Sequence, residues 1–158
     1  MSNYDFDRDF ARERESMAVI RETILNRFQT VADVTPFEGD RRHADIVITA
    51  KSGKKLSVEI KEDFFCAKTG NVAIEISSRG KPSGLSVTRA DTWLIIAHTK
   101  LNQATKDCEF FFIRPETLNN LIDENKYERR HVGGDPGSDT VFYLFNFKKL
   151  KVLKEMHK

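Results

Sequence analysis

Apolar and polar residues alternate most regularly between residues 43 and 62. Residues 46–49 are β-branched, and residues 51–54 read as a turn in which Gly53 is free to take a positive φ. Apolar and polar side chains then alternate strictly over residues 56–61. A period of two is typical of a half-buried strand, so the pattern predicts a β-hairpin.

The parity of this hairpin predicts which side chains share a face. A turn over residues 52–54 pairs odd-numbered residues with odd-numbered residues, which puts Asp45, Glu59 and Lys61 on one face. Opposed Cβ atoms lie about 4.5–5.5 Å apart and diagonal ones about 7–8 Å. Two carboxylates so close repel each other, and a divalent cation of the Mg²⁺ or Mn²⁺ type between them removes that cost. The alternative is an ordinary strand with a solvated charged face.

A helical pattern is predicted over residues 10–34, because apolar residues recur at steps of three and four. Glu13 lies on this stripe one turn before Met17, whereas Glu22 points away from it. We expect the helix to end at Pro36, since the residue before a proline disfavours the α region. The stripe consists of Met17, Ile20, Ile24, Phe28 and Val31.

Periodicity and turn residues divide the rest of the chain. Strands are expected at residues 71–78, 92–97, 109–114 and 140–146, and helices at about 115–126 and from residue 147 onward. Residues 63–70 read as a loop with Phe64 and Phe65 packed inward, and residues 133–137 read as a glycine-rich loop.

Length and composition limit the class of protein. The chain has 158 residues and a net charge of +2, which predicts a single domain over residues 1–158 with a frayed segment at residues 1–9. Its two cysteines, Cys66 and Cys108, form no C-x-x-C pair and suit a reducing compartment. No apolar run approaches the ~20 residues of a membrane span, and no leader peptide is visible. We therefore expect a cytoplasmic location, which is the host cytoplasm for a phage protein, and no membrane partner.

The pair Ala44-Asp45, followed after the hairpin turn by Glu59-Ile60-Lys61, resembles the motif of the PD-(D/E)XK nuclease superfamily, with Ala44 in place of the motif's proline. The order of elements over residues 10–100 is similar too. The resemblance implies an α/β fold with a restriction-endonuclease-like αβββαβ core, in which helices flank a central mixed sheet. A second segment, residues 81–91, resembles a loop of some phage and microbial members.

The resemblance also implies a reaction, which is metal-dependent hydrolysis of DNA phosphodiester bonds. Asp45, Glu59 and Lys61 are then the catalytic residues, and Mg²⁺ or Mn²⁺ is the cofactor. The implied metal ligands are Asp45, Glu59, the Ile60 carbonyl, Glu75 and Glu13. Glu75 joins them only if residues 71–78 pair beside residues 56–61.

Cations and loop residues around these acids are candidates for binding the nucleic-acid backbone. They are Arg41, Arg42, Arg79, Lys81, Ser83, Arg89, Arg129 and Arg130. For Ser83 the alternative is capping of a short turn. His43 is a candidate general base or phosphate contact, and Asp40 is the rival of Asp45 as the first motif acid.

Several assignments stay open. RNA is an alternative substrate. Since the chain lacks a sequence-reading module, structure-selective or non-specific cutting in phage or microbial DNA replication, recombination or repair is the expectation. Cutting a four-way junction takes two active sites and therefore a homodimer. The competing hypotheses are a catalytically inactive nucleic-acid-binding module and a defence or inhibitor protein on the same fold.

Overall fold

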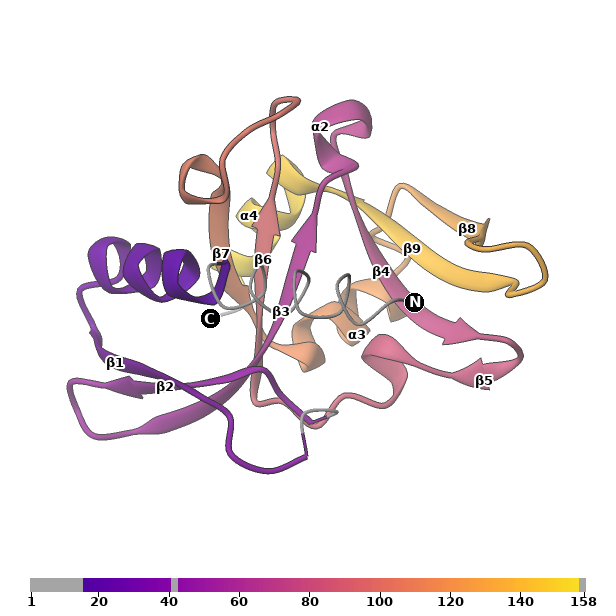
Figure 1. Ribbon diagram of the computed structural model, residues 1–158. Coiled ribbons are helices and arrows are strands. Elements are labelled where there is room, and N and C mark those ends of the chain that lie inside the picture. Colours follow the sequence, from indigo (N-terminus) through magenta and orange to yellow (C-terminus); the bar gives the residue numbers. More distant parts are fainter. Residues whose placement is uncertain (1–15, 41–42, 157–158) are drawn as a thin grey trace, which may run out of the picture.

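The computed structural model describes residues 16–40 and 43–156 (Figure 1). Residues 16–27 are helical, and the chain then turns into strand β1 (Val31–Pro36). The prediction of a helix as far as residue 34 was therefore wrong. Val31 and Val34 fit a helical stripe by spacing, but β-branched residues are also favoured in strands. Here they pair with the next strand, β2 (Ile46–Ala50), with a register shift between Val31 and Asp33.

The first sheet has five strands in the order β1-β2-β3-β6-β7. β3 and β6 run parallel and the other neighbours are antiparallel, so the sheet is mixed and the fold is α/β, as predicted. The expected hairpin parity is confirmed, because Val47 pairs with Ser57 and Thr49 with Lys55. The bounds are β2 (Ile46–Ala50), β3 (Lys55–Asp63), β6 (Thr92–Ala97) and β7 (Glu109–Ile113).

A second sheet, antiparallel throughout, has the order β5-β4-β9-β8. The expectation that residues 71–78 pair beside residues 56–61 was wrong, since β3 lies between β2 and β6. All six residues of β6 are buried, so β6 suits the interior of a sheet, whereas β4 is apolar on one face only. The bounds are β4 (Asn71–Ser78), β5 (Lys81–Pro82), β8 (Arg129–Gly133) and β9 (Thr140–Asn146).

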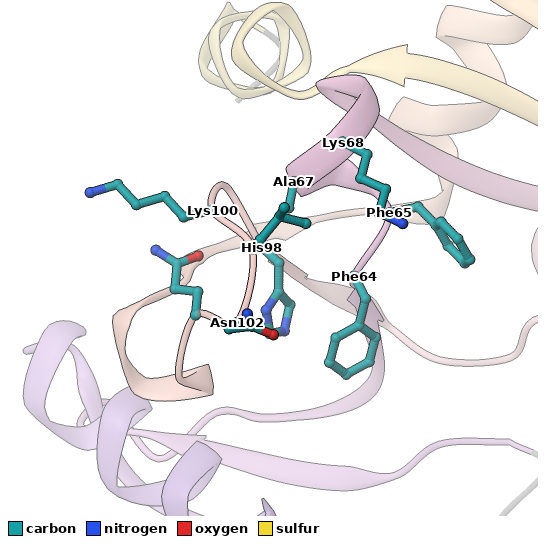
Figure 2. A pocket seen from close by; sticks show the side chains of 9 residues that line it. Phe64, Phe65, Ala67, Lys68, His98, Lys100 and Asn102 are labelled. Atoms are coloured by element: carbon teal, nitrogen blue, oxygen red, sulfur yellow. The ribbon is translucent and has the colours of Figure 1, made fainter.

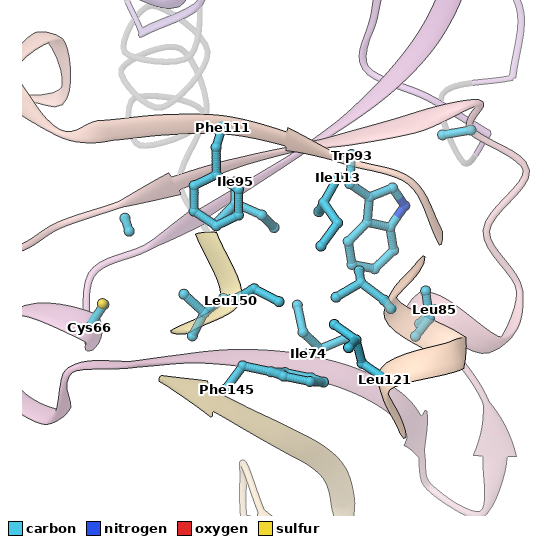
Figure 3. Close-up of a cluster of buried hydrophobic side chains, with 14 of the residues drawn as sticks. Cys66, Ile74, Leu85, Trp93, Ile95, Phe111, Ile113, Leu121, Phe145 and Leu150 are labelled. Carbon is cyan, nitrogen blue, oxygen red and sulfur yellow. The ribbon is translucent and has the colours of Figure 1, made fainter. Parts of the chain in front are cut away.

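The two sheets enclose the larger core, which also includes residues of the helical segments between and after the strands (Figure 3). Trp93 and Ile95 of β6 face Ile74 of β4 and Phe145 of β9 across it. The opposite face of the first sheet packs on the helix at residues 16–27. The remaining elements are α2 (Cys66–Thr69), η1 (Gly84–Ser86), η2 (Thr105–Asp107), α3 (Pro115–Asp123) and α4 (Phe147–Met156).

The chain between β3 and β6 differs from the expected core. A helix was predicted between the strand at residues 71–78 and the strand at residues 92–97, but this connection contains only the short strand β5 and the three-residue 3₁₀ helix η1. β8 was not predicted either. Phe64 and Phe65 point to solvent rather than inward. In the part of the chain described, no helix has both the length and the apolar character needed to cross a membrane.

Candidate active site

Asp45 lies where β2 separates from β3. Its backbone amide donates to the carbonyl of Val58 at 2.9 Å, and Val58 is also the register partner of Ile46, the first residue of β2. Its side-chain Oδ2 accepts a hydrogen bond of 2.7 Å from the amide of Ile60. The carboxylate thus acts as the acceptor that a backbone carbonyl would provide if β2 continued its pairing with β3. This contact fixes the side chain of Asp45 against β3.

Glu59 and Lys61 follow on the same face of β3. The ammonium of Lys61 lies 3.6 Å from Oε1 of Glu59 and 5.2 Å from the ring centroid of Trp93. Glu59 and Trp93 are register partners on the parallel strands β3 and β6. A cation within about 6 Å of an indole ring is attracted by the ring's electrons. Both contacts hold the lysine head beside the glutamate.

Thr88 connects Glu59 to the core. Its hydroxyl donates to Oε2 of Glu59 at 3.1 Å and accepts from the indole Nε1–H of Trp93 at 2.9 Å. Trp93 is almost fully buried, so this chain of hydrogen bonds ties the carboxylate to a rigid residue. Glu59 is therefore oriented from two sides, by Lys61 at one oxygen and by Thr88 at the other.

The segment that carries Thr88 is joined to the start of β3. The amide of Ser57 donates to Oδ2 of Asp91 at 2.8 Å, and the amide of Asp91 donates to the Ser57 hydroxyl at 2.9 Å. This reciprocal pair fixes the chain three residues after Thr88. The sequence indicated a loop here, but the contacts of Thr88 and Asp91 were not predicted, because they depend on the parallel pairing of β3 with β6.

The donor set suits a magnesium or manganese ion. Asp45 and Glu59 supply carboxylate oxygens, and the carbonyl of Ile60 points to the same strand edge as the amide that binds Asp45. Mg²⁺ commonly uses one or two carboxylates and fills its other positions with water and substrate phosphate. Among residues 16–40 and 43–156, no group of three or more His, Cys, Asp or Glu side chains is gathered for a metal.

Glu75 is not brought to these two acids. It lies on β4, where it pairs with Phe142 of β9 in the second sheet, and no described cluster of acids includes it. The predicted route to the site through pairing with residues 56–61 is therefore wrong. The other predicted ligand, Glu13, lies outside the described residues.

One predicted cation borders the site. Nη1 of Arg89 lies 3.2 Å from Nε2 of His43, which is two residues before Asp45. Arg89 itself directly follows Thr88. This pair therefore forms a polar edge beside the Asp45–Glu59 face. Arg41 and Arg42 lie outside the described residues.

The other predicted cations belong to the second sheet. Arg79 and Lys81 flank the β4–β5 turn, and Arg129 and Arg130 lie on β8 at the opposite edge of that sheet. All four are exposed. The structure thus spreads them over two edges rather than gathering them at Asp45 and Glu59 (Figure 1).

The loop after β5 is held tightly against β4. The amide of Ser83 donates to the carbonyl of Ile76 at 3.0 Å, and Gly84 has a φ of +52°. A Cβ on Gly84 would lie 2.3 Å from the carbonyl oxygen of Glu75. The Ser83 side chain caps nothing, contrary to the alternative for this residue, and its buried hydroxyl has no hydrogen-bond partner among the described residues.

Comparisons with known proteins give this chain no relative. No protein-family model matches it, no curated protein matches it, and no solved structure matches it. The assignment of a function therefore depends on the residues and their geometry.

Proposed function

We propose that this chain is a metal-dependent nuclease of the PD-(D/E)XK kind that hydrolyses DNA phosphodiester bonds. The observation that supports the proposal is the hydrogen bond from the Ile60 amide to the Asp45 carboxylate, because Ile60 lies between Glu59 and Lys61 in β3. The same contact turns the Ile60 carbonyl toward Asp45. We propose that these three oxygen donors converge on one cation beside the ammonium group of Lys61.

In this proposal each residue has a distinct task. Asp45, Glu59 and the Ile60 carbonyl hold the cation. A bound Mg²⁺ or Mn²⁺ supplies positive charge to the phosphate and lowers the pKa of a bound water. Lys61 orients the attacking water and stabilises the charge that develops on the phosphoryl oxygens. Thr88 keeps Glu59 in its ligating rotamer, and Arg89 contacts the substrate backbone next to the site.

Replication, recombination or repair of phage or microbial DNA is the setting that we propose, with structure-selective or non-specific cutting. Backbone contacts from Arg79, Lys81, Arg129 and Arg130 give affinity without reading sequence. They lie on the two opposite edges of the second sheet, and we propose that each edge contacts a separate part of a branched or flapped substrate.

The test is a panel of labelled substrates: single-stranded, duplex, flapped and four-way-junction DNA, together with RNA. Each is incubated with Mg²⁺, Mn²⁺ or EDTA, using the wild type and Glu59→Gln. Glu116→Gln, an exposed change on α3, is the matched control. We expect metal-dependent cutting of at least one DNA substrate, lost in Glu59→Gln and kept in Glu116→Gln. Cutting that survives in EDTA or in Glu59→Gln would contradict the proposal.

A binding module without activity is the competing hypothesis from the sequence. It predicts that the wild type retains DNA under all three ionic conditions and cuts none of the panel. It also predicts that Mn²⁺ leaves the melting temperature unchanged, whereas a ligand that binds the native state raises it. If the wild type cuts no substrate and Mn²⁺ does not raise its melting temperature, the binding module replaces the nuclease proposal.

A further inference from the structure

Two adjacent phenylalanines are exposed where β3 ends. Phe64 has 61% of its surface exposed and Phe65 has 72%, and they are the only aromatic residues among the exposed large hydrophobic residues of the described chain. They follow directly after Asp63, the last residue of β3. The candidate catalytic residues Glu59 and Lys61 lie on this same strand.

The two rings point in different directions (Figure 2). The ring of Phe64 lies on the imidazole of His98, with centroids 4.3 Å apart and an interplanar angle of 30°. His98 is buried and is fixed through its Nε2, which lies 2.5 Å from Oε2 of Glu62. One face of Phe64 is therefore supported, whereas Phe65 projects away from His98.

The two rings form a ridge between two hollows. One hollow, of about 510 Å³, is lined by Lys68 and Lys100 as well as by both phenylalanines. The other, of about 680 Å³, is lined by both phenylalanines and by Arg129 and His131 of β8. Volumes in this range accommodate small organic ligands or parts of larger ones. We call Phe64, Phe65 and these four residues the aromatic ridge.

The charge of the ridge is positive. Lys68 and Lys100 form no ion pair with any described residue. The nearby acids are already engaged, because the two oxygens of Asp63 accept the amides of Cys66 and Ala73, both at 2.9 Å. Glu62 accepts the Thr105 hydroxyl at 2.9 Å in addition to its contact with His98. The ammonium groups thus remain available to an anionic ligand.

We propose that the aromatic ridge binds unpaired nucleotides of a nucleic acid. Exposed aromatic faces flanked by cations are the combination that binds single strands, with bases stacked on the rings and phosphates beside the cations. A duplex hides its base faces within the helix stack. This inference rests on the proposed function in taking DNA as the ligand, and it adds that the substrate carries a single-stranded segment.

The ridge is within reach of the candidate site. At about 3.3 Å per residue along a strand, Phe64 lies roughly 10 Å from Lys61. A single strand of DNA that runs from the scissile phosphate along β3 therefore reaches Phe64 within a few nucleotides. Flaps, gaps and frayed ends provide such a segment, whereas a fully paired duplex does not.

The experiment measures binding in EDTA, so that its outcome is independent of cleavage. Fluorescence anisotropy is recorded with a labelled oligothymidylate and with a labelled blunt duplex. The variants are Phe64→Ala, Phe65→Ala, Phe65→Leu and Phe65→Tyr, and Val152→Ala on α4 is the matched control for an exposed apolar side chain. Circular dichroism checks the fold of each variant.

We expect each alanine variant to bind the single strand about 5- to 150-fold more weakly, which corresponds to the 1–3 kcal/mol of one base stacked on an aromatic ring. Phe65→Tyr keeps the wild-type affinity, Phe65→Leu loses it, and Val152→Ala is unaffected. Affinity for the duplex stays within about twofold throughout.

Wild-type affinity for the single strand in both alanine variants would overturn the inference. Sedimentation provides a second way to overturn it: a wild-type dimer that Phe65→Ala dissociates without weakening strand binding would make the ridge a self-contact. If the alanine variants lose single-strand binding and the wild type cuts no substrate, the inference about the ridge holds and the nuclease proposal fails. If the wild type is an active nuclease and the alanine variants bind the single strand normally, the nuclease proposal holds and the inference about the ridge fails.

Discussion

The carboxylate of Asp45 accepts a hydrogen bond from the backbone amide of Ile60 at 2.7 Å. β2 ends its pairing with β3 one step before this point, so the Ile60 amide would otherwise lack a partner. One contact therefore completes the edge of a strand and places an acid next to Glu59. Stability and metal binding are both expected to depend on it.

Replacing Asp45 separates these two roles. Asp45→Ala leaves the Ile60 amide unpaired, and we expect the free energy of unfolding to fall by about 1–3 kcal/mol. Asp45→Asn keeps an acceptor oxygen but removes the charge, so it retains most of the stability and loses metal-dependent cutting. Urea denaturation and a cleavage assay of the two variants measure the difference. Equal stability of Asp45→Ala and the wild type would show that the contact contributes nothing.

Thr88 is predicted to be a positioning residue for Glu59. Thr88→Val removes the hydroxyl that Trp93 and Glu59 share, which leaves a buried indole N–H unpaired at a cost of about 1–3 kcal/mol. We expect weaker Mn²⁺ binding by calorimetry and a changed emission spectrum of Trp93, the only tryptophan of the chain. Thr88→Ser should restore both properties.

A purely structural role for Thr88 predicts a different result. Thr88→Val would then lower the stability while the Mn²⁺ affinity stayed at the wild-type value. Failure of Thr88→Ser to recover the metal affinity would likewise count against the positioning role.

Gly84 is expected to be irreplaceable for a steric reason. A Cβ there would lie 2.3 Å from the Glu75 carbonyl oxygen, and a backbone atom in a strand has little room to move. Gly80 is the matched control, since its φ is +73° but no atom lies within 4 Å of an added Cβ. Gly80→Ala should lower the free energy of unfolding by about 1–2 kcal/mol, the cost of a left-handed conformation for a residue with a Cβ. Gly84→Ala should lower it clearly more, because the steric clash is added. Equal midpoints of urea unfolding for the two variants would contradict this account.

Both cysteines are expected to be unreactive in the native protein. Burial raises the pKa of the Cys66 thiol to about 11, and the charge of Asp63 adds to this. Burial likewise raises the pKa of Cys108 to about 11, with Glu62 contributing. Because an unfolded thiol ionises near 8.5, the native state keeps its protons longer, and the stability from these groups is lost as the pH rises from about 8.5 to 11.

Alkylation by iodoacetamide measures this shift. The rate for the native protein should keep rising between pH 8 and pH 10 as the thiolate fraction grows. A rate that levels off as the pH approaches about 10 would show that the thiols have their ordinary pKa, near 8.5, in the folded chain.

Local patterns were enough to predict the hairpin that carries Glu59 and Lys61. Its register depends on a short turn and on a period of two, and both are contained in residues 43–62. β4, β6 and β9 were also predicted with their observed bounds. These elements are defined by their own residues, whatever they pack against.

Long-range pairing was not contained in those patterns. Alternation in β4 indicates which side chains are buried, but not that β9 rather than β3 is the partner, and this error misplaced Glu75. Val31 and Val34 fit a helix by spacing, and the register shift between Val31 and Asp33 that accommodates them in β1 has no counterpart in the pattern. Phe64 and Phe65 were assigned to the interior on hydrophobicity alone, although both are exposed at the end of β3.

Lys61 gives the most direct test of the proposed nuclease. Single-turnover cleavage of the preferred DNA substrate in Mg²⁺ is measured for the wild type and for Lys61→Met, which keeps the length of the side chain without its charge. We predict a rate about 10²- to 10⁴-fold lower in the variant, as for loss of a group that assists proton transfer, with unchanged affinity for the substrate. A wild-type rate in Lys61→Met, or no metal-dependent cleavage by the wild type on any substrate, would contradict the account.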